Sequence, residues 1–543
     1  MVFQFRNEAI FVMEYNQNIL AERRWRYRSK GCLMKYILSF VILFLFIEIT
    51  YSQFYEYGQD AGSLRWNQFK TPHYRIIYPK GIDSVAHVFA ARLEYFYPHQ
   101  GEVLDHYHRP IPVIIHNEAS FSNGVFVWAP KRLEIFTNPD PNGYAEDWLT
   151  QLALHEGRHA FQIDKLNQGI TRFISVFGGE QVVGAMAAFL PYWYLEGDAV
   201  DAETRFSKSG RGRQPEFEME LKAQLLEKKK VYSFSKATLG SYKDHVPNHY
   251  QLGYLMVRYG RIMHDDKIWI DLQQKVARRP FLVAPTYFAL KQNDAGSKIK
   301  LYRNALDYYR QHWNALGTWR LTNYFHQWNK EPKKYYTSYN FPHYISNSLL
   351  VACKTGVSQI PEFILLGENG EEKRIHRPGY LNSGRISASG NLVAWDEFVP
   401  DMRWSNRNYS VVKILNIGTG EVRSLGKKTR YYSPSISKSG TSIAAVEHHE
   451  MFEFYLVVMD LKGKTLQRIP SPGNLFIQHP AWMEQDSAIV VTMTNRNGKQ
   501  LMQYSMADKS WKQLFDAGFD NISHPVVKGS NIYFNGTFTG IDN

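Results

Sequence analysis

Cysteine is nearly absent from this chain, which has only 2 in 543 residues. Cys32 comes before an apolar run at residues 36–47, and the other is Cys353. If the apolar run belongs to a cleaved signal, the mature chain keeps one cysteine and has no partner for it. An internal disulfide is thereby excluded.

The apolar run YILSFVILFLFI at residues 36–47 is too short to cross a bilayer comfortably, because a transmembrane helix needs roughly 20 apolar residues. Lys35 precedes it, and Thr50 and Ser52 are small residues at the positions that a signal peptidase reads. We expect a signal peptide that starts at Met34 and is cut near Ser52–Gln53, so the protein would be exported. Residues 1–33 are then an upstream extension from a misassigned start codon or a long basic n-region, and an uncleaved anchor is the alternative.

A nucleic-acid-binding motif is also missing, although the formal net charge is +13. The basic residues are scattered, which favours a merely basic surface over a nucleic-acid partner. The hydrophobic share of 44% and the charged share of 21% are typical of globular proteins and exclude a disordered chain. A length of 543 residues predicts two or three domains.

Periodicity divides the chain after the predicted N-terminal segment, residues 1–52. Apolar residues at helical spacing predict a helix at 83–104, and IPVIIH at 111–116 indicates a buried strand. RLEIFT at 132–137 alternates like an exposed or edge strand. Helices are expected next at 144–166 and 181–205, with others near 216–229, 248–263 and 298–314. Strands followed by helices predict an α+β domain over residues 53–330.

Residues 331–543 follow another pattern, in which a short strand, a polar turn and an apolar strand recur at intervals of about 43 to 50 residues. Examples are RISASGNLVAWDEF at 385–398 and PSISKSGTSIAAVEHH at 434–449. The repeat resembles the TolB-like or WD40-like β-propellers of bacterial periplasmic proteins. It implies an all-β propeller that is incomplete, with about four blades and a truncated fifth. A sandwich of tandem hairpins is the alternative.

The segment His155-Glu156-Gly157-Arg158-His159 carries the sharpest chemical signal. On a helix, His155 and His159 share one face and can bind one metal ion, and zinc suits these ligands. Glu156 projects near the same pocket, where its carboxylate can take a proton from water that the metal activates. The other interpretation is a pair of core histidines, because the motif lies on an apolar stripe.

The downstream segment YWYLEGDA at 192–199, followed by Glu203, resembles the WLxEGxA…E helix of gluzincin peptidases. This group contains the aminopeptidase N and leukotriene A4 hydrolase relatives and the wider peptidase MA-like proteins. The resemblance implies a zincin-like metallopeptidase domain with Glu196 as the third zinc ligand. It also implies that Glu203 supports a ligand histidine, which would raise the basicity of that imidazole.

A third segment, Tyr250-Gln251-Leu252-Gly253, resembles the Tyr-x-x-Gly of the same family, whose tyrosine hydroxyl stabilises an oxyanion. Tyr250 could instead be a core aromatic residue of an amphipathic helix. Two features depart from the aminopeptidase pattern. No segment matches the GAMEN type that binds a free amine, and residues 170–193 form an apolar insert that could line the cleft or contact a membrane.

Together these patterns predict a zinc-dependent peptidase of the envelope of a Gram-negative bacterium, in the periplasm or at the outer membrane. Its metal would be Zn2+, held by His155, His159 and Glu196, and its catalytic residues would be Glu156 and Tyr250. Peptides or proteins would be the substrates, and an endopeptidase is favoured over an aminopeptidase because RLEIFT could pair with an extended peptide.

Two other functions stay open. The propeller could be a scaffold for envelope proteins beside a relic zinc domain, or the site could hydrolyse something other than peptides.

Overall fold

The computed structural model describes residues 59–279, 281–282, 284–316, 326–332 and 334–540 of the chain. The predicted extension and signal peptide at residues 1–52 lie outside the described residues. All described residues belong to one compact unit. In this part of the chain every helix is too short or too polar to span a bilayer.

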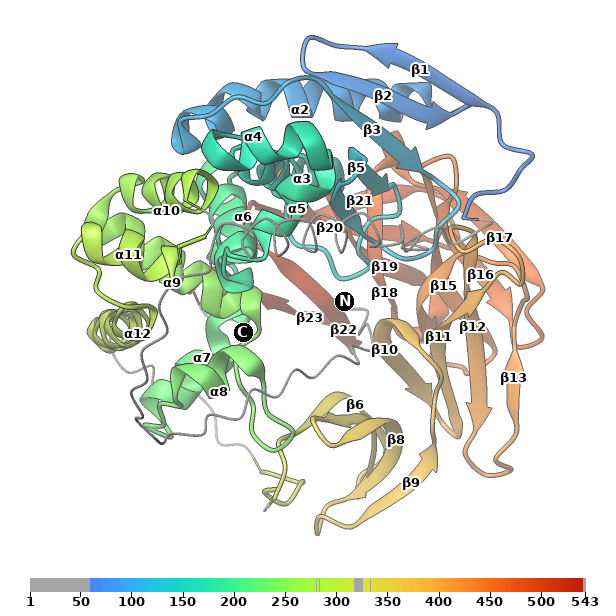
Figure 1. The fold of residues 1–543 in the computed structure, drawn as a ribbon. Coiled ribbons are helices and arrows are strands. Elements are labelled where there is room, and N and C mark those ends of the chain that lie inside the picture. Colours follow the sequence, from blue (N-terminus) through green and yellow to red (C-terminus); the bar gives the residue numbers. More distant parts are fainter. Residues whose placement is uncertain (1–58, 280, 283, 317–325, 333, 541–543) are drawn as a thin grey trace, which may run out of the picture. The chain divides into compact units, whose positions relative to one another are not determined.

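The N-terminal region is built on a mixed sheet of five strands (Figure 1). The strands are β1 (Trp66–Lys70), β2 (Tyr74–Pro79), β3 (Ile111–His116), β4 (Gly124–Trp128) and β5 (Lys131–Phe136). They lie in the order β1-β2-β3-β5-β4. β3 is parallel to β2 and β5, whereas β1 and β4 are antiparallel to their neighbours. Between β2 and β3 the chain forms helix α2 (Asp83–Leu104), whose apolar residues share the core of the sheet.

The expectation of an exposed or edge strand at residues 132–137 is wrong. β5 covers this segment and is hydrogen-bonded to β3 on one side and to β4 on the other. Its alternation is real, since Leu133 and Ile135 are fully buried. Alternation, however, reports the two faces of a strand and not its two edges. The edge strand on this side of the sheet is β4.

After the sheet the chain is helical as far as residue 315. The helices are α3 (Trp148–Asp164), α4 (Gly169–Gly178), α5 (Glu180–Ala187), α6 (Tyr192–Phe206), η1 (Arg211–Arg213), α7 (Pro215–Leu226), α8 (Phe234–Leu239), α9 (His249–His264), α10 (Lys267–Arg278), α11 (Pro285–Gln292) and α12 (Lys298–Ala315).

The continuous helix expected over 181–205 is in fact two helices, α5 and α6. Pro191 separates them with an extended backbone (φ −63°, ψ 135°) and serves as the N-cap of α6. Proline has no N–H and disfavours a helical residue before it, so the helix restarts after Pro191. This restart fixes where the segment with Glu196 begins.

From residue 337 onward the described chain forms antiparallel sheets of consecutive strands, four with four strands and one with two (Figure 1). The strands are β6 (Thr337–Ser346), β7 (Leu349–Gly356), β8 (Gln359–Gly367), β9 (Glu372–His376), β10 (Leu381–Ser389), β11 (Leu392–Pro400), β12 (Asn408–Asn416), β13 (Val422–Ser424), β14 (Tyr431–Ile436), β15 (Ser442–His449), β16 (Glu453–Asp460), β17 (Thr465–Pro470), β18 (Phe476–Trp482), β19 (Ala488–Asn495), β20 (Gly498–Ser505), β21 (Trp511–Gly518), β22 (Ile522–Lys528) and β23 (Asn531–Gly536), with short helices η2 (Pro472–Asn474) and η3 (Glu484–Asp486).

The first strands of successive sheets contact one another, from β6 to β10, β14, β18 and β22. Four-stranded meanders joined through their first strands are the blades of a β-propeller. The C-terminal region is therefore propeller-like, with four complete blades and two strands of a fifth. The helices give way to sheets between α12 and β6, an interval that contains the expected boundary at residue 330.

Hydrogen bonds connect the propeller-like region to the segment before α3. The side-chain amide of Gln478 donates to the carbonyls of Pro141 (3.0 Å) and Gly143 (3.1 Å), and the Lys499 ammonium donates to the Gly143 carbonyl (2.6 Å). Tyr144 follows at once, and its hydroxyl donates to the carboxylate of Glu203 (3.2 Å). The propeller-like strands thus hold a segment that reaches the site described next.

Candidate metal centre

The two histidines of the HExxH segment lie on the buried face of α3. Asp147 caps the helix by accepting hydrogen bonds from the N–H groups of Leu149 and Thr150, which have no partner within the helix. His155 and His159 are one turn apart, so their imidazoles project side by side. Their Nε2 atoms are 3.3 Å apart.

Glycine between the histidines costs the helix up to ~1 kcal/mol relative to alanine, and the packing explains its presence. A Cβ on Gly157 would lie 2.9 Å from Nε2 of Gln100 in α2. That amide donates to the Ala153 and Leu154 carbonyls of α3. Gly157 therefore lets α2 and α3 pack closely behind the histidines.

Glu196 reaches the histidines from α6, which crosses α9 at two glycines. A Cβ on Gly197 would lie 2.1 Å from the carbonyl carbon of Gly253, and a Cβ on Gly253 would lie 2.0 Å from the Trp193 oxygen. Neither glycine can be replaced without moving one helix. The Glu-Gly pair and the Tyr-x-x-Gly segment are thus the two sides of one helix crossing, which fixes α6 opposite α3.

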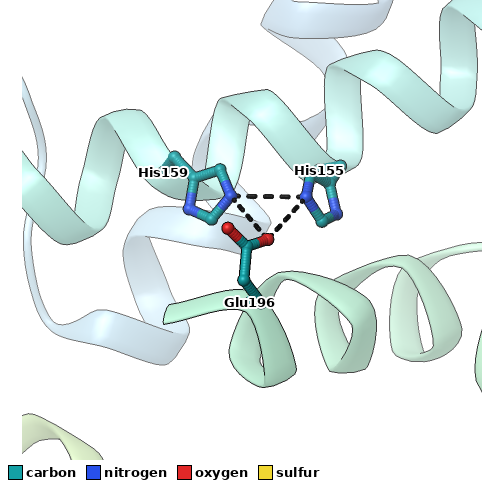
Figure 2. A group of neighbouring side chains, drawn as sticks. All are labelled: His155, His159 and Glu196. Carbon is teal, nitrogen blue, oxygen red and sulfur yellow. Dashed lines mark hydrogen bonds and ion pairs between the residues drawn. The ribbon is translucent and has the colours of Figure 1, made fainter. Parts of the chain in front are cut away.

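Figure 2 shows His155 and His159 on one helix, with the Glu196 carboxylate pointing at both rings from the other. Glu196 Oε2 is 3.3 Å from Nε2 of His155 and 3.4 Å from Nε2 of His159. Within the described ranges, His155, His159 and Glu196 are the one group of three or more His, Cys, Asp or Glu side chains whose potential ligand atoms all lie within 4.8 Å of one another.

The donor set fits a zinc ion. A tetrahedral zinc with ligand bonds of about 2.0–2.1 Å holds its donor atoms about 3.3–3.4 Å apart, which matches the observed spacing of the three atoms. Glu196 Oε2 is also buried and accepts no hydrogen bond from the protein. A buried carboxylate oxygen without such a bond is costly unless a cation faces it. Two imidazoles and a carboxylate are a ligand set of catalytic zinc sites.

Hydrogen bonds fix the orientation of both rings. Glu203 Oε1 is 2.6 Å from Nδ1 of His155, and Gln162 Oε1 is 2.8 Å from Nδ1 of His159. When each Nδ1–H donates outward, each Nε2 presents its lone pair toward Glu196. Both Nε2 atoms are thereby available to a metal ion.

The carboxylates set the charge of the site. Burial alone would lower the pKa of His155, but Glu196 and Glu203 outweigh burial and raise it to about 9. Burial would likewise raise the pKa of Glu196, but the two imidazoles hold it well below its ordinary value. The negative charges therefore favour a cation at this point, whether a proton or a metal ion.

Glu156 lies between the histidine pair and the edge strand β4. A Cβ on Gly124, the first residue of β4, would be 2.6 Å from Cγ and 3.0 Å from Oε1 of Glu156. The carboxyl group is buried, and burial raises its pKa. Glycine at position 124 therefore leaves the room that the Glu156 side chain occupies.

Tyr250, in the first turn of α9, borders the site. Its ring centroid is 6.0 Å from that of His155, and the guanidinium of Arg211 lies 5.0 Å above the Tyr250 ring. Burial raises the pKa of its phenol, and the charge of Glu196 raises it further, so the hydroxyl stays protonated. The structure brings Tyr250 to the site's edge, and its catalytic role stays a prediction.

Three residues at the site were missed by the sequence patterns. Gln162 orients His159, and its position one turn later on the same helix could have revealed it. Arg211 pairs with Glu203, and its Nε donates to Glu203 Oε2 (2.9 Å). Tyr144 donates to the same carboxylate. Arg211 comes from a non-periodic segment, which gives no sequence signal. Tyr144 is the first residue of the helix expected over 144–166, but α3 begins only at Trp148, so helical spacing could not place its hydroxyl.

No protein-family model and no curated protein matches this chain. Solved structures that match include a prolyl endopeptidase, with 13% identity over 37% of this chain and 33% of that chain and a TM-score of 0.28. Another is the putative TolB from Agrobacterium tumefaciens, with 10% identity, 34% and 83% coverage, and a TM-score of 0.24. A third is the β-propeller domain of the Trilobed protease from Pyrococcus furiosus, with 10% identity, 37% and 77% coverage, and a TM-score of 0.25.

The chain spans only 33% of the length of the prolyl endopeptidase. At TM-scores this low, the three likenesses carry no argument about fold or function.

Proposed function

We propose that this protein is a zinc-dependent peptidase with a zincin-like N-terminal domain, acting after export in the bacterial cell envelope. One observation carries the proposal: Nε2 of His155, Nε2 of His159 and an oxygen of Glu196 converge within 4.8 Å. A buried Glu156 beside them supplies the group that such a site needs for hydrolysis.

Each residue of the site has a distinct task. His155, His159 and Glu196 would hold the metal, which supplies Lewis acidity that polarises a peptide carbonyl and makes water acidic at neutral pH. Glu156 accepts the proton of the attacking water on a carboxylate oxygen and passes it to the leaving amine. Its burial raises the pKa, which brings the carboxyl group closer to neutral pH, where proton transfer in both directions is efficient.

Tyr250 acts as a hydrogen-bond donor in this proposal. Its raised pKa keeps the proton on the phenol oxygen, as a donor to a developing oxyanion requires. Arg211 acts indirectly: it pairs with Glu203 and lies over the Tyr250 ring, so it holds both groups in place.

The edge strand β4 is the proposed docking site for an extended peptide. It is hydrogen-bonded to β5 on one side, begins beside Glu156 and exposes Val125 and Trp128. A peptide that pairs with its other edge would pass the site in an extended conformation. Neither β4 nor β5 has a free carboxylate for a terminal amine, since Glu134 pairs with Arg132 and His116. This arrangement favours an endopeptidase.

The test compares zinc content and peptide cleavage in the wild type, in Glu156→Gln and in a control, Glu227→Gln, which changes an exposed glutamate after α7. We expect one zinc per chain in all three proteins. We expect Glu156→Gln alone to lose cleavage of internally quenched peptides by about 10²–10⁴-fold. Peptides with a blocked amino terminus should be cleaved as well as free ones.

Cleavage that survives Glu156→Gln unchanged would remove the proposed base. A wild type that binds zinc but cleaves no peptide would favour the propeller scaffold with a relic site, or a hydrolase for another class of substrate.

A further inference from the structure

Helices α4 and α5 follow each other in the chain and pack together (Figure 1). They present large apolar side chains to solvent. The exposed fractions are 67% for Phe173, 76% for Val176 and 80% for Phe177, all in the last turns of α4. Gly178 and Gly179 follow and make the turn into α5. We call Phe173, Val176 and Phe177 the apolar tip. Side chains of this kind are normally buried, so their exposure at one helix end indicates a partner.

A second segment extends the apolar surface. Thr171 of α4 donates to the Ala277 carbonyl of α10 (2.7 Å), and Arg278 donates to Gln168 just before α4 (3.3 Å). Phe281, three residues beyond Arg278, is 77% exposed. The helix that carries the apolar tip thus packs, through its first turn, against the C-terminal end of α10.

The charged side chains of α4 and of residues 272–292 are all basic. Residues 165–179 and 272–292 contain no aspartate or glutamate, whereas both segments carry lysine and arginine. Arg172, Arg278 and Arg279 are exposed, and in the described part of the chain none of the three forms an ion pair with a carboxylate. Glu180, the first acid after α4, accepts a hydrogen bond from the N–H of Lys131.

Exposed phenylalanines on α4, together with an arginine of α4 and arginines at the end of α10 that contacts its first turn, fit the interface of an anionic bilayer. The rings can enter the boundary between headgroups and acyl chains, while arginines remain at the phosphates. Anionic lipids attract basic residues near their surface. A protein partner would instead need carboxylates that match three separate arginines around an apolar centre.

We propose that the α4–α5 helix pair docks on an anionic phospholipid surface, with the apolar tip inserted and with Arg172, Arg278 and Arg279 against the phosphates. This docking needs neither a metal nor an active site, so it stands or falls independently of the proposed function.

The test places an environment-sensitive fluorophore at Val176→Cys, in a full-length chain whose two native cysteines are replaced by Cys32→Ser and Cys353→Ala. The control position is Leu239→Cys, which is 87% exposed at the end of α8. With vesicles of phosphatidylcholine and phosphatidylglycerol, we expect a blue shift and stronger emission at position 176 and no change at position 239. Adding Phe173→Ser and Phe177→Ser should weaken the response at 176 at least about tenfold.

The second measurement uses the native cysteines, because Cys353 is buried and its replacement could disturb folding. Sedimentation with the same vesicles should be weaker for Phe173→Ser/Phe177→Ser than for the wild type, and unchanged for the exposed pair Leu239→Ser/Tyr242→Ser.

An unchanged signal at position 176, or equal signals at 176 and 239, would overturn the proposal. Equal binding to pure phosphatidylcholine would overturn the role of the arginines. A shift at 176 that depends on protein concentration without vesicles would show that a second copy of the chain covers the tip.

Discussion

Two pairs of histidines in this molecule have opposite surroundings. In the helical region His155 and His159 have ring centroids 4.9 Å apart and face Glu196, with Glu203 behind His155. In the propeller-like region His479 and His524 are closer, with centroids 4.3 Å apart. Burial, with the charges of Arg385 and Lys499, lowers the pKa of His524 to about 3.

The comparison shows that two neighbouring imidazoles do not make a metal site. Around His155 the carboxylates compensate a cation, and the pKa of the imidazole rises to about 9. Around His479, burial and the neighbouring His524, Arg385 and Lys499 hold its pKa well below the ordinary value, and the charges of Arg385 and Lys499 would repel a metal ion. Carboxylate placement therefore distinguishes a metal site from a buried polar pair.

The largest effect is expected from removing one imidazole of each pair. His159→Ala should weaken zinc binding by more than about 100-fold, since it removes one of three direct ligands and loss of an outer partner alone typically costs about 10–100-fold. His479→Ala should leave zinc affinity unchanged. Competition with a chromophoric chelator measures both, and an equal loss in the two variants would abolish the distinction.

Opposite pH dependences are expected from two buried histidines outside the candidate metal centre. Burial lowers the pKa of His116, but Asp60 and Glu134 raise it to about 9 from 6.5. A raised pKa stabilises the fold below pH 6.5, and this contribution is lost as pH rises through about 9. For His524 the lowered pKa means that stability is lost as pH falls below 6.5 toward about 3.

Urea denaturation of His116→Gln and His524→Gln, each against the wild type, measures these contributions. The unfolding free energy that His116→Gln loses relative to the wild type should decrease by up to about 3 kcal/mol between neutral and alkaline pH. The unfolding free energy that His524→Gln loses relative to the wild type should decrease toward acidic pH. Parallel profiles for the two variants would contradict the assigned environments.

A smaller effect is expected at the residues that orient the ligand rings. Glu203→Gln and Gln162→Leu should each reduce zinc affinity by about 10–100-fold, because outer partners fix ring orientation and basicity. Glu227→Gln, at an exposed position, serves as the control. If Glu203→Gln matches the control in the same chelator titration, then the short contact to His155 has no part in metal binding.

The last effect, on stability and not on zinc affinity, is expected at the helix crossing that positions Glu196. Gly253→Ala places a Cβ against the Trp193 carbonyl and should cost about 1–3 kcal/mol in unfolding free energy through overpacking. Gly240→Ala is the control for a glycine with open space around it, although its φ of +92° adds backbone strain of its own. A melting temperature for Gly253→Ala at or above that of the wild type would show that α6 and α9 do not meet at these glycines.

The sequence predicted those helices and strands along which apolar residues recur with one regular spacing. The helix at 83–104 and the strand at 111–116 have the predicted bounds because apolar residues recur along each without a break. The four blades followed from a repeat of polar turns. The sequence did not reveal that β5 is interior, because strand order depends on pairings between distant segments.

Helical spacing and family resemblance predicted part of the candidate site. Spacing placed His155 and His159 together, and resemblance to the gluzincin pattern selected Glu196 and Glu203. Gly124 beside Glu156, and Arg211 and Tyr144 on Glu203, could not be found because they come from loops and strand ends whose positions depend on tertiary packing. Residues 1–52, including the predicted signal peptide, lie outside the described part of the chain.

The most direct test is X-ray absorption at the zinc edge on the wild-type chain loaded with one equivalent of zinc. We predict a first shell of light atoms at about 2.0–2.1 Å with the outer-shell scattering of two imidazoles, and loss of one imidazole in His159→Ala. A spectrum without imidazole scattering, or one that is identical in His159→Ala, would contradict zinc binding by His155, His159 and Glu196.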